Sequence, residues 1–192
     1  MNKRIDSICV FCGSSLGNDL IYKEKAEALG KIIAKENSTL VFGGSNLGLM
    51  GIIADAVLNN GGKVIGVIPE YLFNKGIAHT GLTELNVVKN MNDRKAMMIG
   101  LSDAFIAMPG GYGTLDEITE ILSLNQLNMI GKPCSLFNIK GYFNDYLKQL
   151  DHSVKEKLLR PEHRDMLIVD DYEKALLEKL KNYQKVEIGK WY

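Results

Sequence analysis

The chain has 192 residues, of which 46% are hydrophobic and 24% are charged. This length and composition are ordinary for one soluble α/β domain, so we expect a single domain over residues 1–192. Lysine plus arginine (23) equals aspartate plus glutamate (23), so the chain has no net charge that would attract it to nucleic acid or to an anionic membrane.

Short apolar runs alternate along the chain with longer segments whose apolar residues recur at helical spacing. The short runs predict strands at 7–11, 39–42, 63–68, 85–88, 104–108, 134–137 and 166–169. The longer segments predict helices at 22–35, 49–59, 93–101, 114–128, 141–150 and 173–183, and the rest of 70–90 is predicted to be a loop. Repeated strand–helix units with right-handed crossovers give an α/β fold, a doubly wound, mostly parallel sheet with helices on both faces.

The carboxyl ends of parallel strands meet at one edge of the sheet, and ligands of such sheets bind beyond that edge. Three turns that contain glycine follow predicted strands and therefore fall at this edge: Gly13-Ser14, Gly43-Gly44 and Gly110-Gly111. We therefore expect Ser14, Gly43 and Gly44 to contribute to a binding site together with the turn at Gly110.

The turn from Pro109 to Thr114 joins a buried strand to an amphipathic helix. Its glycines let the backbone approach a ligand without Cβ clashes, and the N–H groups that begin the helix attract an anion. The sequence therefore predicts a phosphate bound by this turn, with contacts from Gly110, Gly111, Tyr112, Gly113 and Thr114.

Glu117 lies in the helix that follows this turn. At about 100° per residue it falls between Ile121 and Leu124 on an apolar flank, whereas Asp116 and Glu120 point to a more polar side. A carboxylate in apolar surroundings costs several kcal/mol unless it has a partner, which favours a functional role for Glu117.

A structural alternative exists for the same residues. Thr114 and Glu117 have the spacing of a capping box, in which each side chain binds the other residue's backbone N–H. A cap explains these two residues and leaves the preceding glycines without a purpose.

Arg94 and Lys95 open the helix before the strand that leads to the glycine turn. Arg94 has the geometry to bind a carboxylate or phosphate with two N–H groups, and Lys95 adds a point charge. The alternative is a pair of solvated cations in a first helical turn, where cations are mildly unfavourable unless an anion compensates them.

Other kinds of site have weaker signals. The run at 42–48 resembles a dinucleotide fingerprint, but its middle glycine position is Ser45, and no acidic residue ends the following strand as a dinucleotide site requires. No metal site is expected, because the histidines are scattered and are predicted to lie in loops or at the surface: His79, His152 and His163. The cysteines lack metal spacing and are predicted to be reduced thiols, buried where they lie in strands: Cys9, Cys12 and Cys134.

With no signal peptide and no apolar stretch long enough to span a bilayer, we expect a soluble cytoplasmic protein without membrane association.

The run PGGYGTLDE at 109–117 resembles the PGGxGTxxE signature of the Lonely Guy (LOG) family, cytokinin-activating phosphoribohydrolases often labelled lysine decarboxylases. The resemblance extends over almost the whole chain. It includes Phe11-Cys12-Gly13-Ser14-Ser15, Gly43-Gly44 with Gly48-Leu49-Met50-Gly51, Ala78-His79 with Leu82-Thr83-Glu84-Leu85, and Met91 with Arg94-Lys95-Ala96.

This resemblance implies a modified Rossmann fold, usually dimeric, with its site near the subunit interface. It implies hydrolysis of N6-modified adenosine 5′-monophosphates, and often AMP, to free base and ribose 5-phosphate without a metal or organic cofactor. It also implies catalysis by Arg94 and Glu117, phosphate binding at 110–114 and substrate contacts from Lys95. The chain departs from the family pattern at Ser45, at Gly76, where a glutamate is common, and at Asn92, where a histidine is common.

Breaking the bond between base and ribose builds positive charge on the sugar, so a carboxylate near the sugar is required. Glu117 suits this role, and both Arg94 and the helix N-terminus favour its ionised form. Lysine decarboxylation has no support, because no segment proposes a Schiff-base lysine for pyridoxal phosphate. The alternatives are a non-catalytic nucleotide sensor or carrier of the same fold, an NAD-dependent oxidoreductase, and a hydrolase for a different nucleotide.

Overall fold

The computed structural model describes residues 4–185 and contains a seven-stranded parallel sheet. Its strands are β1 (Ser7–Phe11), β2 (Thr39–Phe42), β3 (Val64–Pro69), β4 (Glu84–Val88), β5 (Ala104–Ala107), β6 (Cys134–Phe137) and β7 (Leu167–Asp170). The helices are α1 (Leu20–Lys35), α2 (Gly48–Asn59), α3 (Glu70–Phe73), α4 (Met91–Leu101), α5 (Tyr112–Gln126), α6 (Asn144–Lys155), α7 (Pro161–Arg164) and α8 (Glu173–Lys181), with a 3-10 turn η1 at Ile139–Gly141. The predicted α/β class is confirmed.

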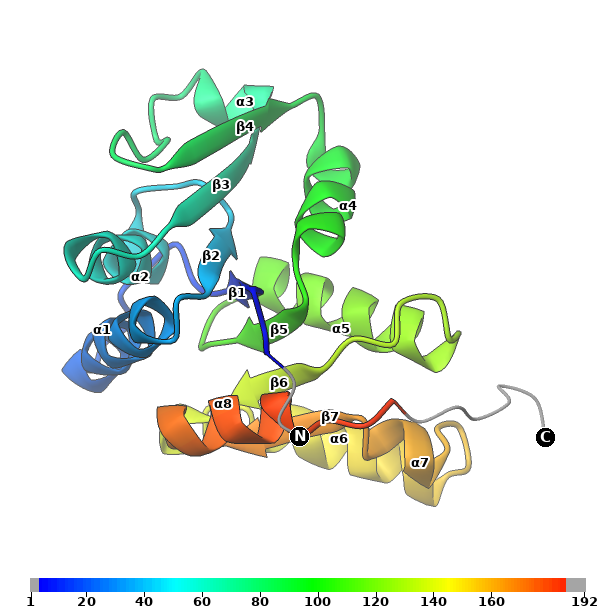
Figure 1. Cartoon of the computed structure of the whole chain (residues 1–192). Helices are drawn as coiled ribbons and strands as arrows, with labels where there is room; N and C mark the ends of the chain where they lie inside the picture. The colour runs from blue at the N-terminus through cyan, green and yellow to red at the C-terminus, as the bar shows by residue number, and fades with distance from the viewer. Residues whose placement is uncertain (1–3, 186–192) are drawn as a thin grey trace.

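The strand order is β4-β3-β2-β1-β5-β6-β7, so the direction of winding reverses between β1 and β5. Figure 1 shows α1 and α2 on one side of the sheet and α4 and α5 on the other. In doubly wound sheets the crevice outside such a reversal is the usual ligand site. Here the turns after β1 and β5 flank it, which places the turn at Gly13 beside the turn at Gly110.

Two apolar clusters, one on each face of the sheet, form the core. In β1 the side chains of Ile8 and Val10 join the cluster under α1, α2 and α8, while Cys9 and Phe11 join the cluster under α4 and α5. Alternate residues of a strand point to opposite faces, so a strand covered on both faces reads as a continuous apolar run.

The three cysteines confirm the prediction of buried, reduced thiols. Cys9, Cys12 and Cys134 are buried and free, and burial raises the pKa of the Cys134 thiol to about 12. Among residues 4–185, no helix is both long and apolar enough to span a lipid bilayer.

Short or capped segments account for most differences from the predicted elements. The loop expected after β3 contains the single-turn helix α3, and α7 was not predicted. The helix expected at 141–150 begins later and extends further, at Asn144–Lys155. The Asn138 side chain accepts a hydrogen bond from the backbone N–H of Phe143 at 2.7 Å, so the preceding residues form a separate turn. One-turn helices have too few residues for a periodic pattern.

The prediction that His163 lies in a loop or at the surface is wrong. His163 lies in α7 with 4% of its area exposed, and neither ring nitrogen has a hydrogen-bond partner among the described residues. Burial lowers the pKa of His163 below its ordinary value of 6.5, with the charge of Arg160 as a smaller cause.

This burial predicts a pH dependence of stability. The unfolded chain binds a proton at His163 more readily than the folded chain, so the free energy of unfolding falls as the pH drops below 6.5. We expect His163→Leu to flatten the decline in melting temperature between about pH 7 and pH 5. His152→Gln, which removes an exposed histidine from α6, is the control, and an unchanged slope in His163→Leu would contradict the assignment.

Candidate active site

The glycine turn after β5 is held closely against the turn after β1. The Gly13 N–H donates to the Pro109 carbonyl at 3.0 Å, and a Cβ on Gly110 would collide with the Thr114 hydroxyl and crowd the Gly13 nitrogen. Glycine is therefore required at position 110 because two backbone segments and a side chain meet there.

Helix α5 begins at Tyr112 with Gly111 as its N-cap, and no side chain caps it. The capping-box alternative is therefore wrong, because Thr114 lies inside the helix and Glu117 binds elsewhere. Among residues 4–185, the backbone N–H groups from Gly111 to Thr114 donate to no protein atom. Free N–H groups at a helix N-terminus, together with the helix dipole, form a site suited to an anion.

A cavity of about 320 Å³ lies beside this turn, a size within the usual range of ligand pockets. Its lining comes from the turns after β1 and β5, from α1 and α2, and from the segment before α6: Gly13, Ser14, Ser15, Leu16, Gly17, Tyr22, Leu49, Pro109, Gly110, Gly111 and Tyr142. The predicted contact residue Ser14 is exposed at this cavity. The edge formed by the carboxyl ends of the strands, where the sequence predicted a ligand, thus contains a cavity at the β1–β5 crevice.

Arg94 and Glu117 form a buried ion pair on the α4–α5 side of the sheet. The Arg94 Nη1 donates to the Glu117 Oε1 at 2.6 Å, and the two side chains are 9% and 7% exposed. The Arg94 Nε donates to the Val67 carbonyl at 3.1 Å, which fixes the plane of the guanidinium. The alternative of a solvated arginine is wrong, and the apolar flank predicted for Glu117 is confirmed.

Burial dominates the electrostatics of Glu117. Desolvation raises the pKa of its carboxyl group, while the charge and hydrogen bond of Arg94 oppose that rise. The expectation that Arg94 favours the ionised form is therefore correct in direction, but burial outweighs it. Among the described residues no hydrogen bond engages the second carboxylate oxygen, Oε2.

Lys95 connects the same two helices one residue further along. Its Nζ lies 3.0 Å from Asp116 Oδ2 and 2.9 Å from Glu120 Oε2, and these carboxylates, Glu120 first, raise its pKa. The polar side predicted for Asp116 and Glu120 is thus the side that holds Lys95. This side chain is 16% exposed, so it is placed in the helix interface rather than free in solvent.

The turn after β2 lies against Arg94. A Cβ on Gly43 would collide with the Arg94 Nη2, and Gly44, at φ 73°, accepts a hydrogen bond from the His79 N–H at 2.9 Å. Gly43 and Gly44 follow the carboxyl end of β2, at the edge of the sheet where the sequence predicted them, and their part in binding stays a prediction. Gly43 contacts Arg94, a predicted catalytic residue, and does not line the cavity beside the glycine turn.

We expect Gly43→Ala to reduce activity more than stability. Its backbone lies outside the left-handed region, so alanine fits the main chain, but the new methyl group must displace a guanidinium held at two points. Turnover should fall about tenfold or more, while the melting temperature changes by only a few degrees. Gly100→Ala, which meets no atom within 4 Å in α4, is the control; equal turnover in the two variants would contradict this placement of Arg94.

The three departures from the family pattern have distinct environments. Ser45 is buried and accepts a hydrogen bond from the Leu47 N–H at 3.2 Å. Gly76 follows α3 in an exposed, left-handed conformation at φ 71°, which favours glycine. Asn92 is exposed in the first turn of α4. None of the three contacts the Arg94–Glu117 pair through a described hydrogen bond.

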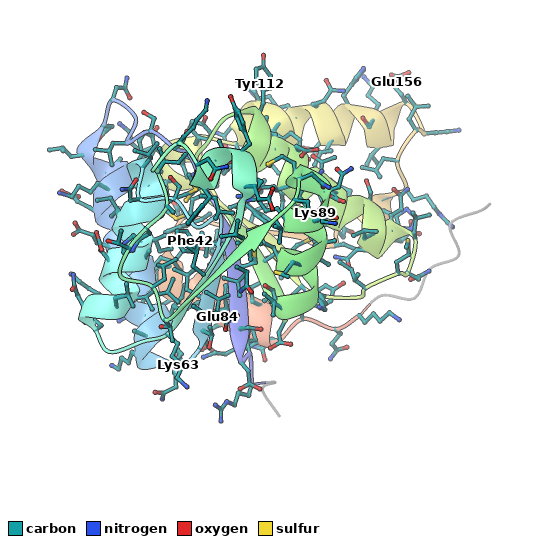
Figure 2. The ribbon with its side chains drawn as sticks, turned by 90° about the horizontal axis from the view of Figure 1, so that it is seen from above. Phe42, Lys63, Glu84, Lys89, Tyr112 and Glu156 are labelled. Atoms are coloured by element: carbon teal, nitrogen blue, oxygen red, sulfur yellow. The ribbon has the colours of Figure 1, made fainter. Side chains whose placement is uncertain are left out.

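Two tyrosines flank the glycine turn, and only one was predicted. Tyr112 is 93% exposed and projects outward from the start of α5, as Figure 2 shows. Tyr142 was not predicted, although its hydroxyl donates to the Gly110 carbonyl at 2.7 Å. The available signal was that Tyr142 closely follows β6, whose carboxyl end lies at the same edge of the sheet.

Solved structures share this fold. The molybdenum cofactor binding protein of Rippkaea orientalis superposes with a TM-score of 0.71 and 25% identity, covering 93% of this chain and 97% of that one. The molybdenum cofactor carrier protein of Chlamydomonas reinhardtii superposes with a TM-score of 0.70 and 20% identity, covering 93% and 98%.

Relatives found by sequence are more similar to this chain than these solved structures are. The model of the family described as "Possible lysine decarboxylase" matches residues 50–180, which include Arg94 and Glu117. The chain is 44% identical over 183 residues to the probable cytokinin riboside 5′-monophosphate phosphoribohydrolase LOGL2 of Oryza sativa subsp. japonica, covering 95% of this chain and 75% of the relative. It is 43% identical to LOG1 of Arabidopsis thaliana, covering 95% and 86%, and 44% identical to the Rhodococcoides fascians phosphoribohydrolase, covering 85% and 83%. Matches of this extent establish that the chain belongs to the LOG family of cytokinin riboside 5′-monophosphate phosphoribohydrolases.

Proposed function

We propose that the protein hydrolyses the N-glycosidic bond of adenosine 5′-monophosphates, N6-modified ones included, to free base and ribose 5-phosphate. The observation that carries this proposal is the position of Glu117. This carboxylate is ion-paired with Arg94 and lies within one helical turn of the free amides at the start of α5. A phosphate on those amides brings the attached ribose to the carboxylate.

The chemistry follows from this arrangement. As the bond between C1′ and the base nitrogen breaks, positive charge develops on the ribose, and the Glu117 carboxylate stabilises it. A water oxygen attacks C1′ as the bond to the base nitrogen breaks, and the water's proton passes to Glu117. The leaving base nitrogen takes a proton from solvent, and Glu117 returns its proton to solvent, so the carboxylate is regenerated. Arg94 holds the carboxylate in place and partly offsets the rise that burial causes in its pKa. Phosphate binding supplies the positioning.

The relatives support the choice of substrate. They are named for cytokinin riboside 5′-monophosphates, and they match 85–95% of this chain at 43–44% identity. We place the protein among the hydrolases of N-glycosyl bonds, with Arg94 and Glu117 as catalytic residues. The 5′-phosphate lies on 110–114, and Ser14, Gly43, Gly44 and Lys95 complete the surroundings of the substrate.

The test is direct release of base. Purified protein is incubated with AMP and with N6-isopentenyl-AMP, and the mixture is chromatographed for adenine, N6-isopentenyladenine and ribose 5-phosphate. We expect stoichiometric appearance of base and sugar phosphate. A nucleotide panel with other bases then defines the preferred substrate, and the absence of base release from every nucleotide would contradict the proposal.

A carrier or sensor that binds a nucleotide without turnover is the second candidate. One observation favours it: the Rippkaea orientalis protein of this fold, at 25% identity, is named for binding the molybdenum cofactor. The same incubation separates the two functions, since a carrier retains the nucleotide and releases no base.

Lysine decarboxylation does not fit the residues present. A lysine that forms a Schiff base with pyridoxal phosphate needs a neutral, accessible amine. Lys95, the lysine beside the ion pair, is held between Asp116 and Glu120, and these carboxylates raise its pKa and keep it protonated. The family's descriptive name therefore does not extend to the chemistry of this site.

We further propose that the protein is a cytoplasmic homodimer that uses the α4–α5 surface. Large apolar side chains are exposed on these helices: Met91, Met97 and Leu101 on α4 and Tyr112 on α5. Methionine and aromatic side chains are enriched in protein–protein interfaces. The free cysteines agree with a reducing compartment. Light scattering that finds a stable monomer would contradict the dimer.

A further inference from the structure

The segment between β6 and α6 places one aromatic hydroxyl on the backbone of the glycine turn. Tyr142 donates from its hydroxyl to the carbonyl oxygen of Gly110 at 2.7 Å. This contact joins residues 32 positions apart. Nothing in the chemistry proposed above uses Tyr142.

The segment that carries Tyr142 is built rigidly. Lys140 and Gly141 both adopt left-handed backbone conformations, at φ 53° and 72°. The Asn138 Oδ1 accepts from the Phe143 N–H, and its Nδ2 donates to the Asn144 side chain at 2.9 Å. These constraints hold the tyrosine at one point above the turn.

The aromatic ring is also fixed. It packs edge-on against Tyr22, with ring centroids 6.0 Å apart, and edge-on against Phe143, with centroids 5.1 Å apart. Lys140 forms an ion pair with Asp19 at the start of α1, which ties the segment to the helix that carries Tyr22. The direction of the hydroxyl is therefore set by packing rather than by the hydrogen bond alone.

Anchoring the Gly110 carbonyl has a consequence for the next amide. The Gly110 carbonyl and the Gly111 N–H belong to one planar trans peptide and point in opposite directions. Two adjacent glycines otherwise leave this peptide free to rotate. A donor on the carbonyl also polarises the peptide and strengthens its N–H as a donor.

From this geometry we infer that Tyr142 is a positioning residue for the 5′-phosphate, because it orients the Gly111 amide toward the anion. The inference rests on the proposed function, which places the phosphate at the start of α5. Tyr142 touches no reacting atom. Its effect is on phosphate affinity, which is the same in the ground and transition states, so it changes KM rather than kcat.

The test is Tyr142→Phe, which removes the hydroxyl and keeps the ring. We expect KM for AMP and the dissociation constant of ribose 5-phosphate to rise about three- to tenfold, the effect of one hydrogen bond, with kcat within about twofold of wild type. The affinity for free adenine should not change. Tyr172→Phe, which removes a hydroxyl from a 46%-exposed ring at the N-cap of α8, outside the cavity lining, is the matched control and should leave all values unchanged.

Calorimetric titration with ribose 5-phosphate separates this inference from the proposed function. If wild-type protein binds ribose 5-phosphate but releases no base from any nucleotide, the proposed hydrolase activity is refuted. The dissociation constant of ribose 5-phosphate in Tyr142→Phe then still tests whether Tyr142 orients the Gly111 amide. An unchanged dissociation constant in a folded Tyr142→Phe variant overturns the inference and leaves the hydrolase intact. An equal loss of adenine and ribose 5-phosphate affinity also overturns it, because a loosened cavity would then be the cause. Tyr142→Leu, which removes the ring as well, should weaken ribose 5-phosphate at least as much.

Discussion

Glu117→Gln is expected to bind AMP with an affinity close to wild type and to release base about 10² to 10⁴ times more slowly. Glutamine keeps the shape of the side chain and an oxygen that accepts from Arg94, so the surroundings of the phosphate are preserved. It loses the charge that stabilises the developing cation on the ribose and the basic group that receives the water proton. Single-turnover release of adenine, measured beside AMP titration, checks both parts.

Asp116→Asn is the matched control for this substitution. It removes a carboxylate from the preceding position of α5, where the side chain is 60% exposed and faces Lys95 rather than the ion pair. We expect base release to stay within a few-fold of wild type. A Glu117→Gln variant that releases adenine at the wild-type rate would show that another group performs the chemistry.

Arg94→Ala is expected to abolish most base release and to lower stability at neutral pH. It leaves the Glu117 carboxylate buried without its partner, and breaking a buried ion pair in this way costs about 3–5 kcal/mol of unfolding free energy. Arg94→Lys retains a cation but loses the fork that binds both Glu117 and the Val67 carbonyl, so we expect partial activity.

The pH dependence distinguishes an electrostatic role for Arg94 from a purely structural one. Burial raises the pKa of Glu117 and Arg94 opposes that rise, so removing Arg94 moves the pKa further upward. Base release requires the ionised carboxylate. The acidic limb of the pH–rate profile for base release should therefore shift to higher pH in Arg94→Ala. A raised carboxyl pKa means that the folded state binds the proton more tightly, so the destabilisation should diminish as the pH falls.

Arg164→Ala provides the comparison, since it breaks an arginine–carboxylate contact with Asp151 away from the site. It should leave the pH–rate profile unchanged. An acidic limb that does not move in Arg94→Ala would mean that the titrating group is not Glu117.

The sequence predicted most of the fold because the relevant signals are local. The continuous apolar run of β1 and the helical spacing in α1 each arise within a few residues, and both elements lie where they were expected. Boundaries shifted where caps decide them, as at α5, which begins at Tyr112 because Gly111 is its N-cap. The helix α7 was missed because its four residues are too few to carry a periodic signal. The burial of His163 was missed because other segments of the chain bury it.

By itself the sequence determined the glycine turn, the helix start that follows it, where we propose the phosphate binds, and the apolar flank on which Glu117 lies. These follow from backbone freedom and helical periodicity, which depend only on neighbouring residues. The geometry of the Arg94–Glu117 pair, the contact of Gly43 with Arg94 and the hydrogen bond from Tyr142 to the Gly110 carbonyl were decided only by the tertiary structure. Each joins elements that are distant in the chain, and their distances depend on how strands order within the sheet and how helices pack on its faces.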